Sequence, residues 1–454
     1  MLLSLVPEEV SQIYKKFKNS GFEIYLVGGC VRGLLTKHKV QDWDFTTNAE
    51  PEQIIKIFPD GFYDNKFGTV GLPLEAFAKG RIPGVAEVTT YRTEQGYQDR
   101  RHPAKVSWGK SIDEDLSRRD FTINAMALDL DSEKIIDPYN GQEDLKKKTV
   151  RAVGDPSKRF KEDALRLMRA ARIATQLGFN IEQKTEDEIK KDASLLSEIS
   201  KERVRDELKK ILESNSPYEG IMLLKQLGLL EYILPELLEG EGVEQARPGR
   251  HHTEDVFTHN SLSLKFCPSE DWLVRFATLI HDIGKPKVAG KDKDGHVIFH
   301  NHEIEGARIA WQICDRLKFS RKEKEKVTNL IRWHMFTVDE HITDSAVRRF
   351  IRRVGIDNVK DMMDLRVGDR LGGGTQTAES WRLKKFKERV AGELAPKPFS
   401  MNDLAVDGSD IMKVLNLKPG PKVGEILQKL FEEVDEDLSK NNKEYLEKRI
   451  KELK

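Results

Sequence analysis

The sequence is poor in the features of secreted and membrane proteins. Only three of its 454 residues are cysteines, and Cys30, Cys267 and Cys314 form no Cys-x-x-Cys pair. Scattered cysteines without a disulfide framework favour a reducing compartment. No stretch approaches the roughly 20 apolar residues of a membrane span, and the N-terminal MLLSLV is too short for the apolar core of a signal peptide. We therefore expect a cytoplasmic protein that does not contact a membrane.

The chain also lacks a net charge. It contains 76 Lys and Arg residues and 76 Asp and Glu residues, so any RNA-binding surface must be a local patch. Charged residues make up 33% of the sequence and the mean hydropathy is -0.56, which is typical of a soluble, helix-rich protein. A length of 454 residues exceeds what one hydrophobic core accommodates and predicts three or four domains.

The most informative segment follows a short apolar strand predicted at Ile24–Val27. A diglycine turn comes next, then an arginine and two aspartates that are one residue apart: Gly28, Gly29, Arg32, Asp42 and Asp44. Residues two apart on a strand project from the same face, so both carboxylates point at one spot. Paired carboxylates can hold Mg²⁺ against nucleotide phosphates, while the diglycine admits those phosphates and the arginine adds a cationic fork. The pattern predicts a metal-dependent nucleotidyl transfer site.

This order of strand, diglycine, arginine and Asp-x-Asp resembles the nucleotidyltransferase head of the polymerase-β superfamily, in particular CCA-adding tRNA nucleotidyltransferases and bacterial poly(A) polymerases. We expect the head over residues 1–150. Its predicted elements are helices over Val10–Lys18 and Pro51–Ile57 and strands over Thr69–Leu72 and Val85–Tyr91. Glu87 is a candidate third carboxylate, with an exposed strand glutamate as the alternative. The charged segment Arg92–Pro103 is expected to be a mobile loop beside the site.

A second head motif is RRDFTINA, at residues 118–125. It resembles the signature by which the family's head closes on the ribose and triphosphate of the nucleotide. The resemblance assigns Arg119 to phosphate or sugar contact, with Asp120 and Asn124 in support. A charged helix cap is the alternative interpretation.

After residue 150 the sequence becomes helical. One helix is predicted from Pro156 to Gly178, and an acid and three arginines recur on it at three-residue intervals: Asp163, Arg166, Arg169 and Arg172. This face suits an anionic ligand, with a solvated, salt-bridged face as the default alternative. An Asp-x-x-Arg pair can also read a base, because a carboxylate accepts from an exocyclic amine and a guanidinium donates to a ring acceptor. Cytosine and adenine present that combination, whereas uracil and guanine do not.

The segment EDALR at residues 162–166 resembles the EDxxR base-template motif of class II CCA-adding enzymes, and Ile199–Leu212 resembles the neck helix that follows it. The resemblance implies a neck over residues 151–215, in which Asp163 and Arg166 select the base. The triphosphate partners that it implies are Arg32, Arg119, Arg169 and Arg172. The sequence departs from the family at Gly33, where an aspartate is usual.

Nine of the eleven histidines lie between His251 and His341. Ala277–Pro286, ATLIHDIGKP, predicts a buried helix that ends in a His-Asp pair, and it resembles the HD phosphohydrolase motif. The ligands implied for one or two divalent metals are His259, His281, Asp282, His302, His334 and Asp369, with residues 251–255 and 300–303 as alternatives. These donors suit Mn, Ni, Zn or Fe. The resemblance implies hydrolysis of a phosphoester, such as a cyclic or terminal phosphate on a tRNA end. A degenerate domain with surface histidines is the alternative.

The remaining sequence predicts a helical body over residues 216–372 and a helical tail over residues 373–454. Arg348–Arg353 and Trp381–Arg389 offer a local positive surface beside a predicted turn at Pro419–Pro421, although exposed basic helix faces are common. In the resembled family the tail binds the tRNA elbow through contacts with the RNA backbone, and it recognises the shape of the elbow rather than its sequence. A single charged helix is expected over Glu432–Lys454.

Together these patterns predict an α+β fold, in which an N-terminal mixed β-sheet head precedes an all-α neck, an HD-containing body and a tail. The expected reaction adds C and A to tRNA 3′ ends from CTP and ATP, with Mg²⁺ at Asp42 and Asp44. The alternatives are an A-only or C-only adding enzyme, a poly(A) polymerase, or an HD phosphohydrolase with an inactive head. Residues 64–72 lack the GRRF-type element of poly(A) polymerases. The sequence leaves the oligomeric state open.

Overall fold

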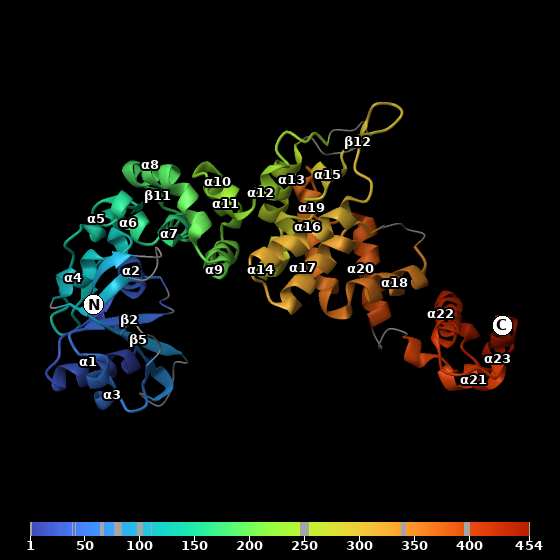
Figure 1. The fold of residues 1–454 in the computed structure, drawn as a ribbon, viewed down its shortest axis with the longest axis horizontal. Helices are drawn as coiled ribbons and strands as arrows, with labels where there is room; N and C mark the ends of the chain where they lie inside the picture. Colours follow the sequence, from blue (N-terminus) through green and yellow to red (C-terminus); the bar gives the residue numbers. More distant parts are fainter. Residues whose placement is uncertain are drawn as a thin grey trace. The chain divides into compact units, whose positions relative to one another are not determined.

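The computed structural model describes residues 2–38, 40, 42–63, 68–76, 84–97, 103–109, 111–245, 254–336, 342–394 and 400–453. The chain divides into two compact units, Met1–Pro235 and Glu236–Lys454. The first combines a sheet with helices, and the second is almost entirely helical (Figure 1). Among the described helices, none is both long and apolar enough to cross a membrane. The finer boundaries at residues 150, 215 and 372 stay predictions.

The first unit is built on a mixed sheet that has seven strands within the described residues, in the order β3-β4-β5-β2-β1-β8-β9. Its central pair, β2 and β5, is parallel, and the neighbouring pairs are antiparallel. The strands are β1 Ile24–Val27, β2 Trp43–Thr47, β3 Phe62–Tyr63, β4 Thr69–Pro73, β5 Val85–Thr90, β8 Ala127–Leu128 and β9 Ile135–Ile136. The predicted mixed sheet is therefore confirmed.

Helices of the head cover this sheet. They are α1 Glu8–Asn19, α2 Gly29–Thr36, α3 Pro51–Ile57, α4 Ile112–Ser117 and α5 Gly141–Lys146. In α1, Val10, Ile13 and Phe17 recur at helical spacing and are fully buried in one cluster with Leu26 and Phe45 of the sheet. The apolar stripe thus explains both why this segment is a helix and which face it packs.

The predicted loop over Arg92–Pro103 is wrong for its described part. Strands β6 Arg92–Tyr97 and β7 Pro103–Trp108 pair as an antiparallel ladder, and residues 98–102 lie outside the described ranges. Arg92 pairs with Trp108 at one end and Tyr97 with Pro103 at the other. The hydrogen bonds of the ladder join backbone groups, which can pair whatever the polarity of the side chains. The charged sequence of this segment therefore gave no sign of the two strands.

The helix predicted from Pro156 to Gly178 is also wrong, because it is two helices, α6 Pro156–Glu162 and α7 Leu165–Leu177. Between them Asp163 is extended, with φ -144° and ψ 102°, and its carboxylate accepts a 3.1 Å hydrogen bond from the amide of Leu165. Aspartate competes with the helix for backbone donors in this way. The other elements of this region are β10 Thr149–Val150, β11 Asn180–Ile181, α8 Gln183–Asp192, α9 Lys201–Leu212, α10 Pro217–Gln226 and α11 Leu230–Ile233.

In the second unit, α13 Val256–Phe266 packs against α14 Trp272–Leu279 and α19 Val359–Gly372, while α16 His302–Arg316 packs against α17 Arg321–Trp333. The remaining elements are α12 Pro235–Leu238 at the boundary of the units, α15 Lys285–Val288, β12 Gly290–Lys291, β13 Val297–Ile298, α18 Asp344–Val354, α20 Trp381–Leu394, α21 Gly408–Leu415, α22 Pro421–Glu436 and α23 Lys443–Glu452. The predicted turn at residues 419–421 is confirmed. The single helix expected over Glu432–Lys454 is wrong, because Asn442 caps a new helix through the amide of Tyr445 at 2.9 Å.

The positive surface expected at Arg348–Arg353 is only half present. Arg348 is buried, and its Nε lies 2.8 Å from Oδ1 of Asp435 on α22. Arg352 binds the same carboxylate at 2.5 Å. These two arginines therefore tie α18 to α22, whereas Arg349 and Arg353 are exposed.

Candidate active sites

The turn after β1 brings a backbone bend, a carboxylate and an arginine together. Gly28 has φ 75° and ψ -136°, a conformation that residues with a Cβ avoid. A Cβ on Gly28 would lie 3.1 Å from Nη1 of Arg119 and 3.4 Å from Oδ2 of Asp44. Gly29 begins α2, and its Cβ would be 3.6 Å from Nη2 of Arg32, an ordinary contact. Of the two glycines, Gly28 is the one that the site geometry requires.

Three carboxylates lie on neighbouring strands beside this turn. Asp44 on β2 stands opposite Glu87 on the parallel strand β5, and the exposed Asp42 immediately precedes β2. Burial raises the pKa of Asp44 to about 6; Arg119 opposes the rise, while Glu87 and Asp42 add to it. A divalent cation would relieve this mutual repulsion, so the donor set fits the Mg²⁺ expected from the sequence.

A hydrogen-bond network supports the arginine of the turn. Arg32 donates to the side-chain oxygen of Asn124, whose amide donates to Oδ1 of Asp120 at 3.0 Å. Arg169 of α7 donates to Oδ2 of Asp120 through Nε at 2.9 Å and Nη2 at 2.6 Å. Both oxygens of Asp120 are therefore held by protein donors, and its supporting role stays a prediction.

Arg119 has a buried acidic partner that the sequence did not single out. Its Nη2 lies 3.0 Å from Oδ2 of Asp115, which also binds Arg118 at 2.5 Å. Burial opposes ionisation of Asp115, but Arg118 and Arg119 outweigh it and lower its pKa. The spacing of three and four residues is the signal that could have revealed these pairs.

The two residues predicted to form the base template, Asp163 and Arg166, take different hydrogen-bond partners for their side chains. Asp163 binds Arg203 of α9 with two contacts, of 3.2 and 2.7 Å. Arg166 donates to Glu162 at 3.1 Å and to the carbonyl of Arg118 at 2.8 Å. The structure thus brings each residue to the neck but gives each a different partner.

The other two arginines of the predicted face also form ion pairs with acidic side chains, each with a different one. Arg172 binds Glu207 at 2.5 Å, and Arg169 is the partner of Asp120 described above. Arg203 and Glu207, which sequence reasoning missed, are four residues apart on α9 and lie on the face that packs against α7. An opposite-charge pair at helical spacing was the available signal.

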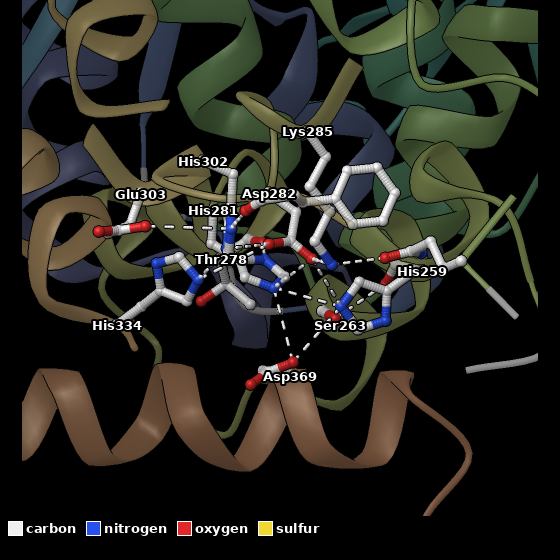
Figure 2. Close-up of polar contacts among 12 residues, drawn as sticks. His259, Ser263, Thr278, His281, Asp282, Lys285, His302, Glu303, His334 and Asp369 are labelled. Atoms are coloured by element: carbon white, nitrogen blue, oxygen red, sulfur yellow. Dashed lines mark hydrogen bonds and ion pairs between the residues drawn. The ribbon is translucent and has the colours of Figure 1, made fainter. Parts of the chain in front are cut away.

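All six residues predicted for the HD site converge in the second unit (Figure 2). Oδ2 of Asp282 lies 3.3 Å from Nε2 of His259 and 3.4 Å from Nε2 of His281. Oδ1 of Asp369, on α19, closes the same group at 3.4 and 3.6 Å from these nitrogens. The four ligand atoms form one half of the cluster.

The other oxygen of Asp282 faces a second group. Its Oδ1 lies 3.3 Å from Nε2 of His302 and 3.6 Å from Nε2 of His334. The Nδ1 atoms of His281, His302 and His334 lie 2.8, 2.8 and 2.7 Å from backbone carbonyls. A carbonyl only accepts, so each Nδ1 donates, and in the neutral ring Nε2 keeps its lone pair for the cluster.

The electrostatics of the cluster fit divalent cations. Burial disfavours ionised Asp282 and Asp369, yet Lys285 and the neighbouring histidines hold the pKa of Asp282 well below its usual range, and hydrogen bonds from His259 and His281 do the same for Asp369. Burial opposes protonation of His259, but Asp282 and Asp369 raise its pKa to about 9. Two groups of donor atoms, one with His259 and His281 and one with His302 and His334, share Asp282, and each would suit a divalent cation.

The HD turn owes its geometry to Gly284, and it carries one cation that was not predicted. A Cβ on Gly284 would come within 2.2 Å of the carbonyl of His302, so only glycine lets α16 approach the turn. Lys285 is buried, binds Oδ2 of Asp282 at 2.5 Å and donates to Gln245. Of the alternative ligands, His300 is exposed and Asp255 caps α13, while residues 251–253 lie outside the described ranges.

Comparisons with known proteins match most of the chain. Residues 24–151 match the "Poly A polymerase head domain", residues 178–240 the "Probable RNA and SrmB-binding site of polymerase A", and residues 301–450 the tRNA nucleotidyltransferase domain 2. The A-adding tRNA nucleotidyltransferase of Deinococcus radiodurans is 38% identical over 335 residues, covering 71% of this chain and 75% of that protein. The CCA-adding enzyme of Ligilactobacillus salivarius is 31% identical over 460 residues, covering 100% and 99%.

Among solved structures, the Bacillus stearothermophilus CCA-adding enzyme in complex with CTP matches with a TM-score of 0.71 at 26% identity, covering 98% of both chains. The sheet with its carboxylates, followed by helical segments, defines a nucleotidyltransferase. Within that class the chain belongs to the tRNA nucleotidyltransferase family, whose members include CCA-adding and A-adding enzymes. The predicted family and the predicted α+β fold with a helical body and tail are confirmed; the HD assignment stays a prediction.

Proposed function

We propose that this enzyme completes the 3′ end of tRNA with CCA, taking the nucleotides from CTP and ATP. The observation that carries the proposal is the group of Asp42, Asp44 and Glu87 beside the Gly28 bend and Arg119. The match to the L. salivarius CCA-adding enzyme over nearly the whole of both chains supports it. The three cysteines are free thiols, which agrees with a cytoplasmic location.

In this mechanism Asp42, Asp44 and Glu87 would hold Mg²⁺, which when bound neutralises the triphosphate and the leaving pyrophosphate. The bend at Gly28 lets the backbone approach the phosphates, and Arg119 is poised over the bend to donate to them. Arg32 joins from α2, oriented by its hydrogen bond to Asn124. These groups align the α-phosphate for attack by the tRNA 3′-hydroxyl, with pyrophosphate leaving on the opposite side.

Base selection is assigned to Asp163 and Arg166. The Asp163 carboxylate would accept from the amine of cytosine or adenine, and the Arg166 guanidinium would donate to the adjacent ring acceptor. Arg203 holds Asp163 in a fixed direction and could release one of its oxygens to the base. Arg169 and Arg172 stay proposed triphosphate partners that share their guanidinium groups with acids. The tail, residues 373–454, which contains the basic segment Trp381–Arg389, is the proposed contact for the tRNA elbow.

The first experiment supplies tRNA transcripts that end before CCA, after C and after CC. CTP and ATP are given singly and together with Mg²⁺, and the 3′ ends are sequenced. Stepwise completion to CCA supports the proposal. A single A added only to the CC-ended transcript would identify an A-adding enzyme like the D. radiodurans relative, and a long A tract would identify a poly(A) polymerase.

A second activity is favoured by the bridging position of Asp282. We infer a metal-dependent phosphohydrolase, with His259, His281, Asp282 and Asp369 holding one divalent transition metal ion and Asp282, His302 and His334 holding another. Elemental analysis should find Mn, Ni, Zn or Fe in the purified protein. Asp282→Asn should remove both the metal and metal-dependent phosphate release from a phosphorylated RNA end, while CCA addition continues. Full phosphate release by this variant would refute the assignment.

A further inference from the structure

Two arginine-lined pockets adjoin in the second unit and share the ring of Phe336. The first is a cavity of about 310 Å³, and the residues of its wall that matter here are Arg332, Trp333, Arg349 and Arg353. The second is a cavity of about 340 Å³ with Arg366, Arg370, Trp381 and Arg382 in its wall. Each volume is at the lower end of the range for small-molecule sites. Among the lining residues that the structure describes, Glu303 is the one carboxylate.

The arginines of α18 divide cleanly between structure and pocket. Arg348 and Arg352 both form ion pairs with Asp435, which tie α18 to α22. Arg349 and Arg353 are also four residues apart, but they are exposed and line the first pocket. The tertiary packing explains only half of this basic sequence, and the other half faces a cavity.

Trp333 organises two of the guanidinium groups. Arg332 lies with its Cζ 4.4 Å from the centre of the indole ring, and Arg353 lies 4.8 Å from it. Stacking uses the face of a guanidinium and leaves its N–H edge able to donate to a phosphate in two parallel bonds. In the second pocket, Trp381 is 58% exposed and offers a ring on which a base can stack.

In each pocket, one lining residue contacts a residue of the HD cluster. In the first, Trp333 and Met335 flank His334 in the chain, and Oε2 of Glu303 is 4.0 Å from Nδ1 of His302 (Figure 2). In the second, Nη1 of Arg366 is 2.8 Å from Oδ2 of Asp369. Glu303 therefore links the first pocket to His302, and Arg366 links the second pocket to Asp369.

We propose that the two pockets bind the two 3′-terminal nucleotides of a single-stranded RNA segment and present its end phosphate to the HD cluster. Two cavities that share Phe336 in their walls suit consecutive nucleotides, and six arginines beside the rings of Trp333 and Trp381 are the chemistry of single-strand recognition. The hydrolysis rests on the phosphohydrolase proposed above, whereas the binding does not. In that step water adds to phosphorus, the bond from phosphorus to the ribose oxygen breaks, and a proton from water passes to that oxygen.

Binding is tested first, with full-length protein in EDTA and a short ribo-oligonucleotide that carries a 3′-phosphate. The double variant Arg349→Gln/Arg353→Gln should weaken binding at least tenfold. Arg321→Gln is the matched control, because Arg321 is an exposed arginine of α17 that pairs with Glu325 and lies outside both pockets. A mononucleotide should bind more weakly than a dinucleotide. Equal binding by the double variant and the control would overturn the proposal.

Crosslinking separates these pockets from the nucleotidyltransferase head, which also meets RNA ends. An oligonucleotide with a photoreactive base at its 3′ end should crosslink to the peptide that contains Trp333–Phe336. Crosslinks confined to residues 24–47 of the head would overturn the proposal. A crosslink to Trp333–Phe336 that disappears in the double variant supports it.

Hydrolysis distinguishes failure of the pockets from failure of the phosphohydrolase. With Mn²⁺ or Ni²⁺, the double variant should raise KM for a 3′-phosphorylated dinucleotide at least tenfold more than KM for p-nitrophenyl phosphate, which has no base or second nucleotide. Equal changes for the two substrates would overturn the substrate assignment. If wild type releases no phosphate from either substrate, but binding and crosslinking depend on the arginines, the phosphohydrolase fails and the RNA site stands.

Discussion

Replacing Gly28 and Gly29 singly by alanine should give effects of opposite sign on stability. Gly28 has φ 75° and ψ -136°, and holding an alanine there costs about 1–3 kcal/mol. Gly29 lies in the first turn of α2 without a positive φ, and alanine is favoured over glycine in a helix by about 0.5–1 kcal/mol. The free energies of unfolding of the two variants should therefore differ by about 1.5–4 kcal/mol.

Activity should separate the two variants further. The new Cβ at position 28 would lie 3.1 Å from Nη1 of Arg119, closer than an ordinary contact, and would touch Oδ2 of Asp44 at 3.4 Å. Because misplacing catalytic groups by 1 Å costs on the order of 100-fold in rate, the smaller shift of Arg119 should still lower activity. The stability of the head alone is measured by unfolding the protein in urea and monitoring hydrogen exchange in peptides from β1 and β2. Incorporation of labelled CTP into tRNA measures activity. Equal stability of the two variants, or wild-type activity of Gly28→Ala, would refute the reasoning.

Three further predictions concern ion pairs. Burial opposes ionisation of Asp120, but Arg169 and Asn124 outweigh it and lower its pKa, so this carboxylate stabilises the fold above about pH 4 and the contribution is lost as pH falls through the lowered pKa. Asp120→Asn should flatten the acid side of the pH–stability curve, and an unchanged curve would contradict this. Arg348→Met should lower the free energy of unfolding in urea by about 3 kcal/mol, the low end for breaking a buried ion pair. The low end is expected because Arg352 still binds Asp435. A decrease below about 1 kcal/mol would be inconsistent with a buried pair. Arg203→Gln should lower the ratio of CTP to UTP incorporation about tenfold, the equivalent of one charge-assisted hydrogen bond, and wild-type discrimination would exclude Arg203 as the residue that orients the base template.

The motifs predicted the head well where chemistry is local. The alternation of Asp42 and Asp44 predicts two carboxylates on one face, and the structure places Asp44 on β2 opposite Glu87, with Asp42 just before the strand. Local patterns failed where long-range partners decide the outcome. Nothing in Arg92–Pro103 indicated a ladder, because its hydrogen bonds join backbone groups that any sequence carries.

The neck shows the same division. The EDxxR motif could be recognised in the sequence. However, an acid and three arginines at even spacing give the same sequence pattern whether they bind a ligand or form ion pairs within the protein. Folding paired Asp163 with Arg203 and Arg169 with Asp120, contacts of 40 and 49 residues in sequence separation.

By itself the sequence determined the family and the mixed-sheet head with helices after it, and it predicted the residue types of both candidate sites, because strand alternation, glycine turns and metal-ligand chemistry depend on short segments. Only the tertiary structure decided which partner each charge takes. It also decided that Asp282 faces two groups of histidines at once and that half of the arginines of α18 are buried. Those outcomes depend on which helices pack together, and packing selects among contacts that the local sequence allows equally.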